Sequence, residues 1–224
     1  MRGIPTELNL PKEPQKLADL VYQALEHAIL NNQLVPGQKL VEDEISLQLG
    51  VSVTPVREAL VRLEREGLVT RAFYRTPTVR VFTRKEAVEL CYLRGALEQL
   101  AIELACERIT PAGIERLIQT QKDADACLAA DDFSGYVRTN EAFHKILIEL
   151  SKNELLMETL RGIWNQIQMI NVTSAQIPGT PRQSVAEHLK IIEALKASDA
   201  AGAKRLMRMH IRRLRKRLEK ALKD

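Results

Sequence analysis

The sequence is poor in cysteine, glycine and proline, and it contains no long apolar run. Its three cysteines, Cys91, Cys106 and Cys127, show no pairing pattern, which argues against a disulfide scaffold and for a reducing compartment. With 10 glycines and 9 prolines the chain is neither fibrous nor low in complexity. No stretch of about 18 uninterrupted apolar residues occurs and the N-terminus lacks the apolar region of a signal peptide, so we expect a cytoplasmic protein without a membrane span.

Apolar residues still make up 45% of the 224 positions, enough for a sizeable core, but the charges are unevenly spread. Residues 1–83 carry ten basic and ten acidic groups, residues 84–203 carry 13 and 17, and residues 204–224 carry ten and two. The net charge of +4 therefore comes from the C-terminal end. Bulk charge alone does not establish nucleic-acid binding.

The first 83 residues predict a flexible arm over 1–14 and a small winged helix-turn-helix domain over 15–83. Apolar residues at three- and four-residue steps predict a first helix from Lys16, with its inward face formed by Leu17, Leu20, Val21, Ala24, Leu25, Ala28 and Ile29. A short second helix is expected to turn Ile45 and Leu49 inward and to end at Gly50. A third helix, over about 54–66, is expected to bury Val56, Ala59, Leu60 and Leu63, with Ser52 or Thr54 as its cap.

Two short strands, 68–71 and 78–82, are expected to flank a tip at 74–77, which completes the wing. In this plan the third helix can enter a major groove and point its first turn at phosphates and base edges. Segment 51–80 carries six arginines against three glutamates, so it is locally basic.

From Thr83 onward the pattern predicts an all-α antiparallel bundle over 84–224, so the fold class is mostly α. Thr83 and Glu86 fit a capping box. Further helix starts are expected at Thr110, Asp131–Asp132, Ser151 and Ser198–Asp199. The expected helices span about 84–108, 112–129, 133–150, 153–171, 183–197 and 199–222, with the clearest loop at 173–181.

Four spaced blocks in the first domain resemble the DNA-binding domain of GntR transcription regulators: 34–40 (LVPGQKL), 49–52 (LGVS), 54–60 (TPVREAL) and 63–69 (LEREGLV). The resemblance implies that double-stranded operator DNA is bound by the start of the third helix and by the wing. By position it implies DNA contacts from Ser52, Thr54, Arg57 and Arg75. Glu42 matches a frequent acidic position whose role stays open.

Two positions depart from that family pattern. Val53 stands where an arginine that commonly contacts guanine is usual, and Thr76-Pro77 stands where the wing tip usually has glycine. We therefore expect an altered operator preference, with Arg57 and Arg75 carrying more of the contact. The alternative for Arg57 is an ion pair with Glu58 or Glu64 on a solvated helix.

Three of the four histidines, His144, His188 and His210, fall on the apolar faces of three predicted helices, whereas His27 only flanks such a face. A buried imidazole needs a hydrogen bond or a metal. Asn140 precedes His144 by four residues, so both side chains can reach one point. Such a set suits zinc, nickel, manganese or similar ions, and three separately satisfied core histidines remain the alternative.

The second region resembles the FCD effector domain of FadR-type GntR regulators, most specifically at 140–144 (NEAFH), 151–156 (SKNELL), 187–188 with 191–195, and Ala203 with Met207 and His210. The resemblance implies that Asn140, His144, His188 and His210 hold a divalent ion. Asn140 replaces the commoner aspartate and gives the ion less charge. Arg94 matches a frequent inward arginine that could pair an effector carboxylate, and a salt bridge to Glu98 is the alternative.

Two further sequence patterns allow other interpretations. The Asn140-Glu141…His144 spacing lies one residue from the HExxH pattern of zinc hydrolases, but no other catalytic motif supports an enzyme. The basic residues of the last helix favour a solvated face, with DNA or partner contact as the alternative; they are Arg205, Arg208, Arg212, Arg213, Arg215, Lys216 and Arg217.

The prediction is a homodimeric, DNA-binding transcription regulator, expected to be a repressor and not an enzyme. Its operator affinity is expected to respond to a small organic acid effector bound near the metal. A regulator for which the metal ion itself is the signal is the main alternative.

Overall fold

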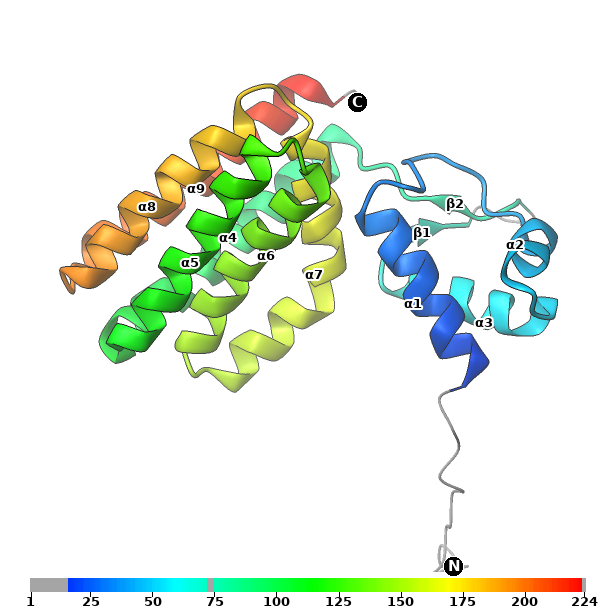
Figure 1. Cartoon of the computed structure of the whole chain (residues 1–224), viewed down its shortest axis with the longest axis horizontal. Helices are drawn as coiled ribbons and strands as arrows, with labels where there is room; N and C mark the ends of the chain where they lie inside the picture. The colour runs from blue at the N-terminus through cyan, green and yellow to red at the C-terminus, as the bar shows by residue number, and fades with distance from the viewer. Residues whose placement is uncertain (1–15, 72–74, 223–224) are drawn as a thin grey trace, which may run out of the picture.

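The computed structural model describes residues 16–71 and 75–222, and the predicted arm 1–14 and Tyr74 lie outside them. This part of the chain confirms the mostly helical class (Figure 1). The order is α1 (Leu17–Leu30), α2 (Glu42–Leu49), α3 (Val53–Arg65), β1 (Val69–Thr70), β2 (Thr78–Val79), α4 (Arg84–Arg108), α5 (Pro111–Ala129), α6 (Phe133–Leu150), α7 (Glu154–Ala175), α8 (Thr180–Lys196) and α9 (Ala200–Ala221). We call α1 to β2 the N-terminal unit and α4 to α9 the bundle.

The N-terminal unit is organised around α3, whose predicted inward residues Val56, Ala59, Leu60 and Leu63 are all buried. This apolar face packs on α1, and the antiparallel strands β1 and β2 lie beside it, with Val69 opposite Val79 and Thr70 opposite Thr78. The strands are shorter than predicted because only these two residue pairs form the ladder. A bridge from Lys39 to Thr78 ties the loop before α2 to the hairpin.

The predicted inward faces of α1 and α2 were partly wrong. Leu17 and Leu20 of α1 are each 47% exposed, and the unpredicted Tyr22 is buried instead. Leu49 of α2 is 39% exposed, since this short helix buries no residue fully and rests on the core only through the half-buried Ile45. A unit of this size has too little interior to cover every apolar position of its helices.

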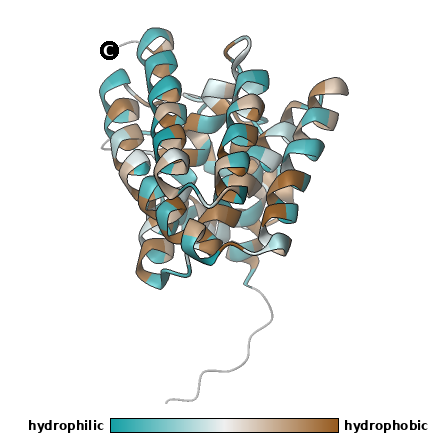
Figure 2. Cartoon of the chain, turned by 90° about the vertical axis from the view of Figure 1, so that its left-hand side faces the viewer, coloured by the Kyte–Doolittle hydropathy of each residue, from teal (hydrophilic) through white to brown (hydrophobic). Residues whose placement is uncertain are grey.

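The bundle is built on close packing of α4 along α9, with α5 lying against α6 and α8. Brown apolar and teal polar residues alternate along the bundle helices in Figure 2, as amphipathic helices around a shared core require. A Cβ at Gly95 would lie 3.4 Å from Cγ2 of Ile211, an ordinary van der Waals distance, so α4 and α9 pack directly against each other at this point. The capping box predicted at Thr83 and Glu86 is present and begins α4.

The loop predicted at 173–181 is shorter than expected. Helix α7 continues to Ala175 and α8 starts at Thr180, so only residues 176–179 connect them. Ser174 and Thr180 are buried, and burial of these small polar residues extends both helices beyond what their sequence suggests. The start of α7 agrees with the predicted one to within a residue, but the cap differs, because Asn153 rather than Ser151 accepts the capping hydrogen bond, from the backbone of Leu156.

Helix α7 connects the bundle to the N-terminal unit. The side-chain amide of Asn165 donates hydrogen bonds to Glu26 at 3.1 Å and to Glu66 at 2.7 Å. The hydroxyl of Tyr22 lies within hydrogen-bond distance of the same two carboxylates. Gln166 of α7 makes a second contact with the N-terminal unit, at Gly67, where an added Cβ would stand 2.8 Å from its Nε2. Among the described helices, none has the length and apolar character needed to cross a membrane.

Candidate metal and effector site and candidate DNA-binding face

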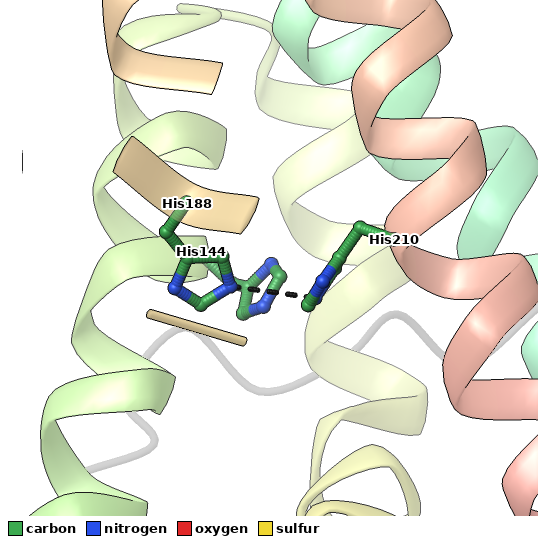
Figure 3. A group of neighbouring side chains, drawn as sticks. All are labelled: His144, His188 and His210. Carbon is green, nitrogen blue, oxygen red and sulfur yellow. Dashed lines mark hydrogen bonds between the residues drawn. The ribbon is translucent and has the colours of Figure 1, made fainter. Parts of the chain in front are cut away.

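Three histidines from three helices meet inside the bundle (Figure 3). His144 lies on α6, His188 on α8 and His210 on α9, and they are 1%, 1% and 5% exposed. One ring nitrogen of each lies within 4.8 Å of the other two. His27, by contrast, is exposed on α1, so the structure separates it from the set as the sequence predicted.

Each of the three rings has an oxygen acceptor beside its Nδ1 atom. Gln121 Oε1 lies 3.2 Å from Nδ1 of His188, and Glu187 Oε2 lies 2.7 Å from Nδ1 of His210. Glu98 Oε2 lies 2.9 Å from Nδ1 of His144, a close contact that lacks the alignment of a hydrogen bond. An acceptor at Nδ1 favours the tautomer whose Nε2 lone pair is free, which is the arrangement found behind metal-bound histidines.

The donor set fits a divalent ion. The Nε2 atom of His144 is buried and has no hydrogen-bond partner, which is costly for a polar atom without a ligand. The Nε2 atoms of His188 and His210 are 3.3 Å apart and form a hydrogen bond with each other (Figure 3). This spacing is also close to the edge of about 3.3–3.4 Å implied by tetrahedral zinc–nitrogen bonds of about 2.0–2.1 Å.

Burial also sets the protonation of the rings. Burial lowers the pKa of His144 to about 4 and lowers the pKa of His188 well below its ordinary value. Both imidazoles are therefore neutral near pH 7, the form that binds a metal. Burial opposes ionisation of Glu98 as well, but the charge of Arg94 and the hydrogen bond that it donates outweigh burial and hold the pKa of that carboxyl below its usual range.

Arg94 forms the salt bridge to Glu98 that was the alternative to an effector contact. Its Nε donates to Glu98 at 2.8 Å and its Nη1 donates to Oδ1 of Asn171 at 2.8 Å, with all three side chains buried. Its Nη2 is buried without a partner. Arg94 is not among the residues that line the cavity beside the histidines. Through Glu98 it connects to His144.

A small cavity adjoins the histidines and is lined by Asn140, His144 and His210. Its volume is about 20 Å³, room for about one water molecule. Arg213 and Arg217 of α9 line it too, and four hydroxyl groups add further polar atoms, those of Tyr136, Ser174, Thr180 and Ser184. Asn140 therefore sits one helical turn from His144 on the wall of this cavity, as its spacing predicted.

Sequence reasoning missed several of these residues. Arg213 and Arg217 were assigned to a solvated basic face, although they follow His210 at three and seven residues and so share its side of the helix. Glu187 was missed because it precedes His188 directly, yet it reaches both His210 and Nη1 of Arg213, the latter at 2.8 Å.

Glu141, the candidate general base of a hydrolase, points elsewhere. Its Oε1 accepts a hydrogen bond from Nε1 of Trp164 at 2.8 Å, and Lys145 pairs with the same atom. Glu141 is not among the residues that line the cavity. The carboxylate thus serves the contact between α6 and α7.

The residues predicted to contact DNA are all exposed in the N-terminal unit. Ser52 is the N-cap residue of α3, Thr54 is in its first turn and Arg57 is one turn further, and all three are exposed. Arg75, where the described chain resumes, is exposed as well. Arg57 pairs with Glu42 of α2 rather than with Glu58 or Glu64.

Comparisons with known proteins agree with this two-part architecture. Residues 17–74 match the family described as bacterial regulatory proteins, gntR family, and residues 89–213 match the FCD domain. The chain is 35% identical to the Nta operon transcriptional regulator of Aminobacter aminovorans over 71% of its own length and 74% of that protein. It is 24% identical to the HTH-type transcriptional repressor RspR of Escherichia coli K12, over 94% and 91% of the two chains.

Solved structures show the same fold. A putative transcriptional regulator GntR from Rhodococcus sp. RHA1 superposes with a TM-score of 0.80 at 25% identity, covering 92% of this chain and 99% of that one. E. coli McbR/YncC superposes with a TM-score of 0.78 at 24% identity, covering 93% and 99%.

Proposed function

Since the chain belongs to the gntR family of bacterial transcription regulators and carries an FCD domain, we propose that a metal-assisted effector site in the bundle controls its affinity for operator DNA. The observation that carries the proposal is the buried set of His144, His188 and His210 beside an arginine-lined cavity. A bundle that only supported the DNA-binding unit would gain little from burying so many polar groups.

The proposed division of labour follows the sequence blocks. Residues 15–83 bind operator DNA through Ser52, Thr54, Arg57 and Arg75, and residues 84–224 sense the effector and form the dimer. The exposure of these four side chains on α3 and the wing supports the first assignment. A regulator of this kind acts in the cytoplasm, where the DNA is.

In the bundle, Asn140, His144, His188 and His210 would hold a divalent ion of the zinc, nickel or manganese class. Bound there, the ion supplies a positive centre that attracts an anionic effector. Arg213 and Arg217 line the same cavity, which has room for about one water molecule, so it would have to widen before they could pair an effector's carboxylate. The cavity hydroxyls would then donate hydrogen bonds to the same ligand. Arg94, which pairs with Glu98, would keep that carboxylate beside His144.

Helix α7 is the proposed route between the two sites. Its Asn171 and Ser174 line the cavity, and its Asn165 holds Glu26 and Glu66 of the N-terminal unit. Asn165 and Asn171 are six residues apart, about 9 Å along a helix. A small shift of α7 on effector binding would therefore move the N-terminal unit and alter the fit of two such units to an operator.

A homodimer is proposed through the outer face of α4. Tyr92, Leu93 and Leu100 are exposed there at 62%, 47% and 42%, and their spacing puts them on one side of the helix. Leu93→Glu is expected to lower the oligomer mass to that of one chain in sedimentation experiments. An unchanged mass for this variant would exclude this face as the interface.

The coupling is tested by calorimetry on the metal-loaded full chain. Citrate, a small carboxylate, is titrated with and without a DNA duplex that the protein has selected from a random pool. Linkage requires that the duplex change the affinity for a coupled acid by the same factor as the acid changes DNA affinity. Equal affinities for any acid recovered with the purified protein, with and without duplex, would refute the coupling.

The alternative is that the metal ion itself is the signal. It predicts a large, reversible change in DNA affinity when the ion is removed by chelation and restored, with no acid present. The effector proposal predicts instead that the acid changes DNA affinity while the ion stays bound. Mass spectrometry of acids recovered with the purified protein identifies the compound to test.

A further inference from the structure

Glu42, the first residue of α2, holds two arginines that belong to two other elements. Its Oε2 accepts hydrogen bonds from Nε of Arg57 at 3.0 Å and from Nη2 of Arg57 at 2.8 Å. Its Oε1 accepts a longer one, at 3.4 Å, from Nη2 of Arg71, which directly follows β1. One carboxylate thus connects α2, α3 and the hairpin.

The contact leaves the base-reading edge of Arg57 free. A guanidinium presents N–H groups along a side edge, formed by Nε and Nη2, and along an end edge, formed by Nη1 and Nη2. Glu42 occupies the side edge. The end edge offers the pair of parallel donors that matches O6 and N7 of a guanine in the major groove.

The two side chains of the pair differ in exposure to solvent. The side chain of Arg57 is 61% exposed, whereas that of Glu42 is 20% exposed, so the carboxylate lies on the protein side and the cation faces outward. An arginine that is already fixed loses less side-chain freedom when it binds, and this raises both affinity and selectivity.

We propose that Glu42 is a positioning residue for DNA recognition, which fixes Arg57 for contact with a guanine and holds Arg71 nearby as a cation for the DNA backbone. The inference rests on the proposed DNA-binding face at the start of α3. It assigns a function to an acidic residue beside a surface that binds a polyanion. It also explains how Arg57 can discriminate bases although Val53 offers no donor.

A purely electrostatic role for Glu42 predicts the opposite sign. A carboxylate near DNA repels phosphates, so its neutralisation would tighten binding to every sequence. A positioning role predicts instead that neutralisation lowers the preference for the selected sequence over other sequences. The ratio of the two affinities therefore separates the roles.

The experiment uses the full chain and a duplex that the wild type enriches from a randomised pool. The affinity of the protein for this duplex is compared with its affinity for a scrambled duplex of equal composition, at one salt concentration. Glu42→Gln is expected to lower the affinity ratio about tenfold, the loss of one bidentate base contact. Glu44→Gln is the matched control, because Glu44 is exposed on the same helix and the substitution changes the charge equally.

Two further variants show that the effect passes through Arg57. In an Arg57→Ala background, Glu42→Gln is expected to cause no further loss of the ratio. Glu42→Asp keeps the charge but shortens the side chain, so it is expected to lose selectivity while its melting curve follows that of the wild type.

The proposal is overturned if Glu42→Gln and Glu44→Gln change the ratio equally, or if Glu42→Gln tightens binding to the selected duplex. Full selectivity in Glu42→Asp, or an additive loss in the double variant, would also overturn it. If the wild type enriches no sequence at all, the proposed DNA-binding face itself fails, which is a separate result.

Discussion

The two parts of the molecule treat charge in opposite ways. The N-terminal unit buries apolar side chains and keeps its arginines and glutamates at the surface, where Arg57 and Glu42 pair in contact with solvent. The bundle instead places Arg94, Glu98 and the three histidines in its interior. Surface charge costs little and suits a polyanionic partner, whereas buried charge is costly and needs a ligand or a network to satisfy it.

The largest expected effect tests the cost of the buried charge. Glu98→Gln leaves Arg94 buried without its counter-ion and is expected to lower the free energy of unfolding by about 3–5 kcal/mol. Glu149→Gln, which removes the exposed pair with Arg116, should cost under about 1 kcal/mol. Urea denaturation measures both values, and similar losses in the two variants would remove the distinction between the parts.

Acid sensitivity is the next largest effect. The pKa of His144 is about 4 in the folded protein because the ring is buried, against about 6.5 when unfolded. The unfolded state therefore binds more protons between these values, and stability present above about pH 6.5 is lost as the pH falls towards about 4.

The measurement is urea denaturation of chelator-treated protein across that pH range. His144→Asn should flatten the pH dependence, while His27→Asn, a change on the exposed face of α1, should leave it as in the wild type. A wild-type slope retained by His144→Asn would show that this ring is not protected from protons.

Because the charges of the N-terminal unit lie at its surface, we expect the loss of one of them to change DNA binding and to leave stability almost unchanged. Arg57→Ala is expected to weaken DNA binding about tenfold and to reduce the salt slope by up to about one, with an unchanged melting curve. Arg208→Ala on the exposed face of α9 is the control for basic charge elsewhere. Fluorescence anisotropy across salt concentrations measures the DNA affinity of each variant. Equal salt dependence of affinity for Arg57→Ala and the wild type would show that Arg57 is not part of the interface.

The smallest effect concerns the start of α4, between the two parts. Thr83→Ala removes the hydrogen bond to the backbone of Glu86 and should cost about 1 kcal/mol of unfolding free energy. Thr159→Ala, an exposed position inside α7, should be near neutral. Thermal denaturation of the two variants provides the check, and equal stabilities would mean that the cap contributes nothing.

The sequence was most informative where a local signal determines structure. Thr83 and Glu86 mark a helix start through a contact within four residues, and the inward face of α3 follows from its periodicity. The face of α1 was less predictable, because burial of Tyr22 and exposure of Leu20 depend on which partner helices are near. The continuous helix through Ser174 likewise depends on packing inside the bundle.

The same limit applies to the site. The burial of His144, His188 and His210 could be predicted because the three residues lie on apolar helix faces. Glu98, Gln121 and Glu187 could not, since their contacts with the rings join helices separated by tens of residues. The partner of Arg57 was missed for that reason too, because Glu42 lies on another helix.

The most direct test of the buried site is calorimetric titration of Zn²⁺ into the chelator-treated full chain, with His188→Ala and His27→Ala alongside. We predict about one tightly bound ion per chain for the wild type and for His27→Ala, and none for His188→Ala, whose melting curve in the absence of metal establishes that it is folded. Identical binding by the wild type and a folded His188→Ala would contradict a metal site at these histidines.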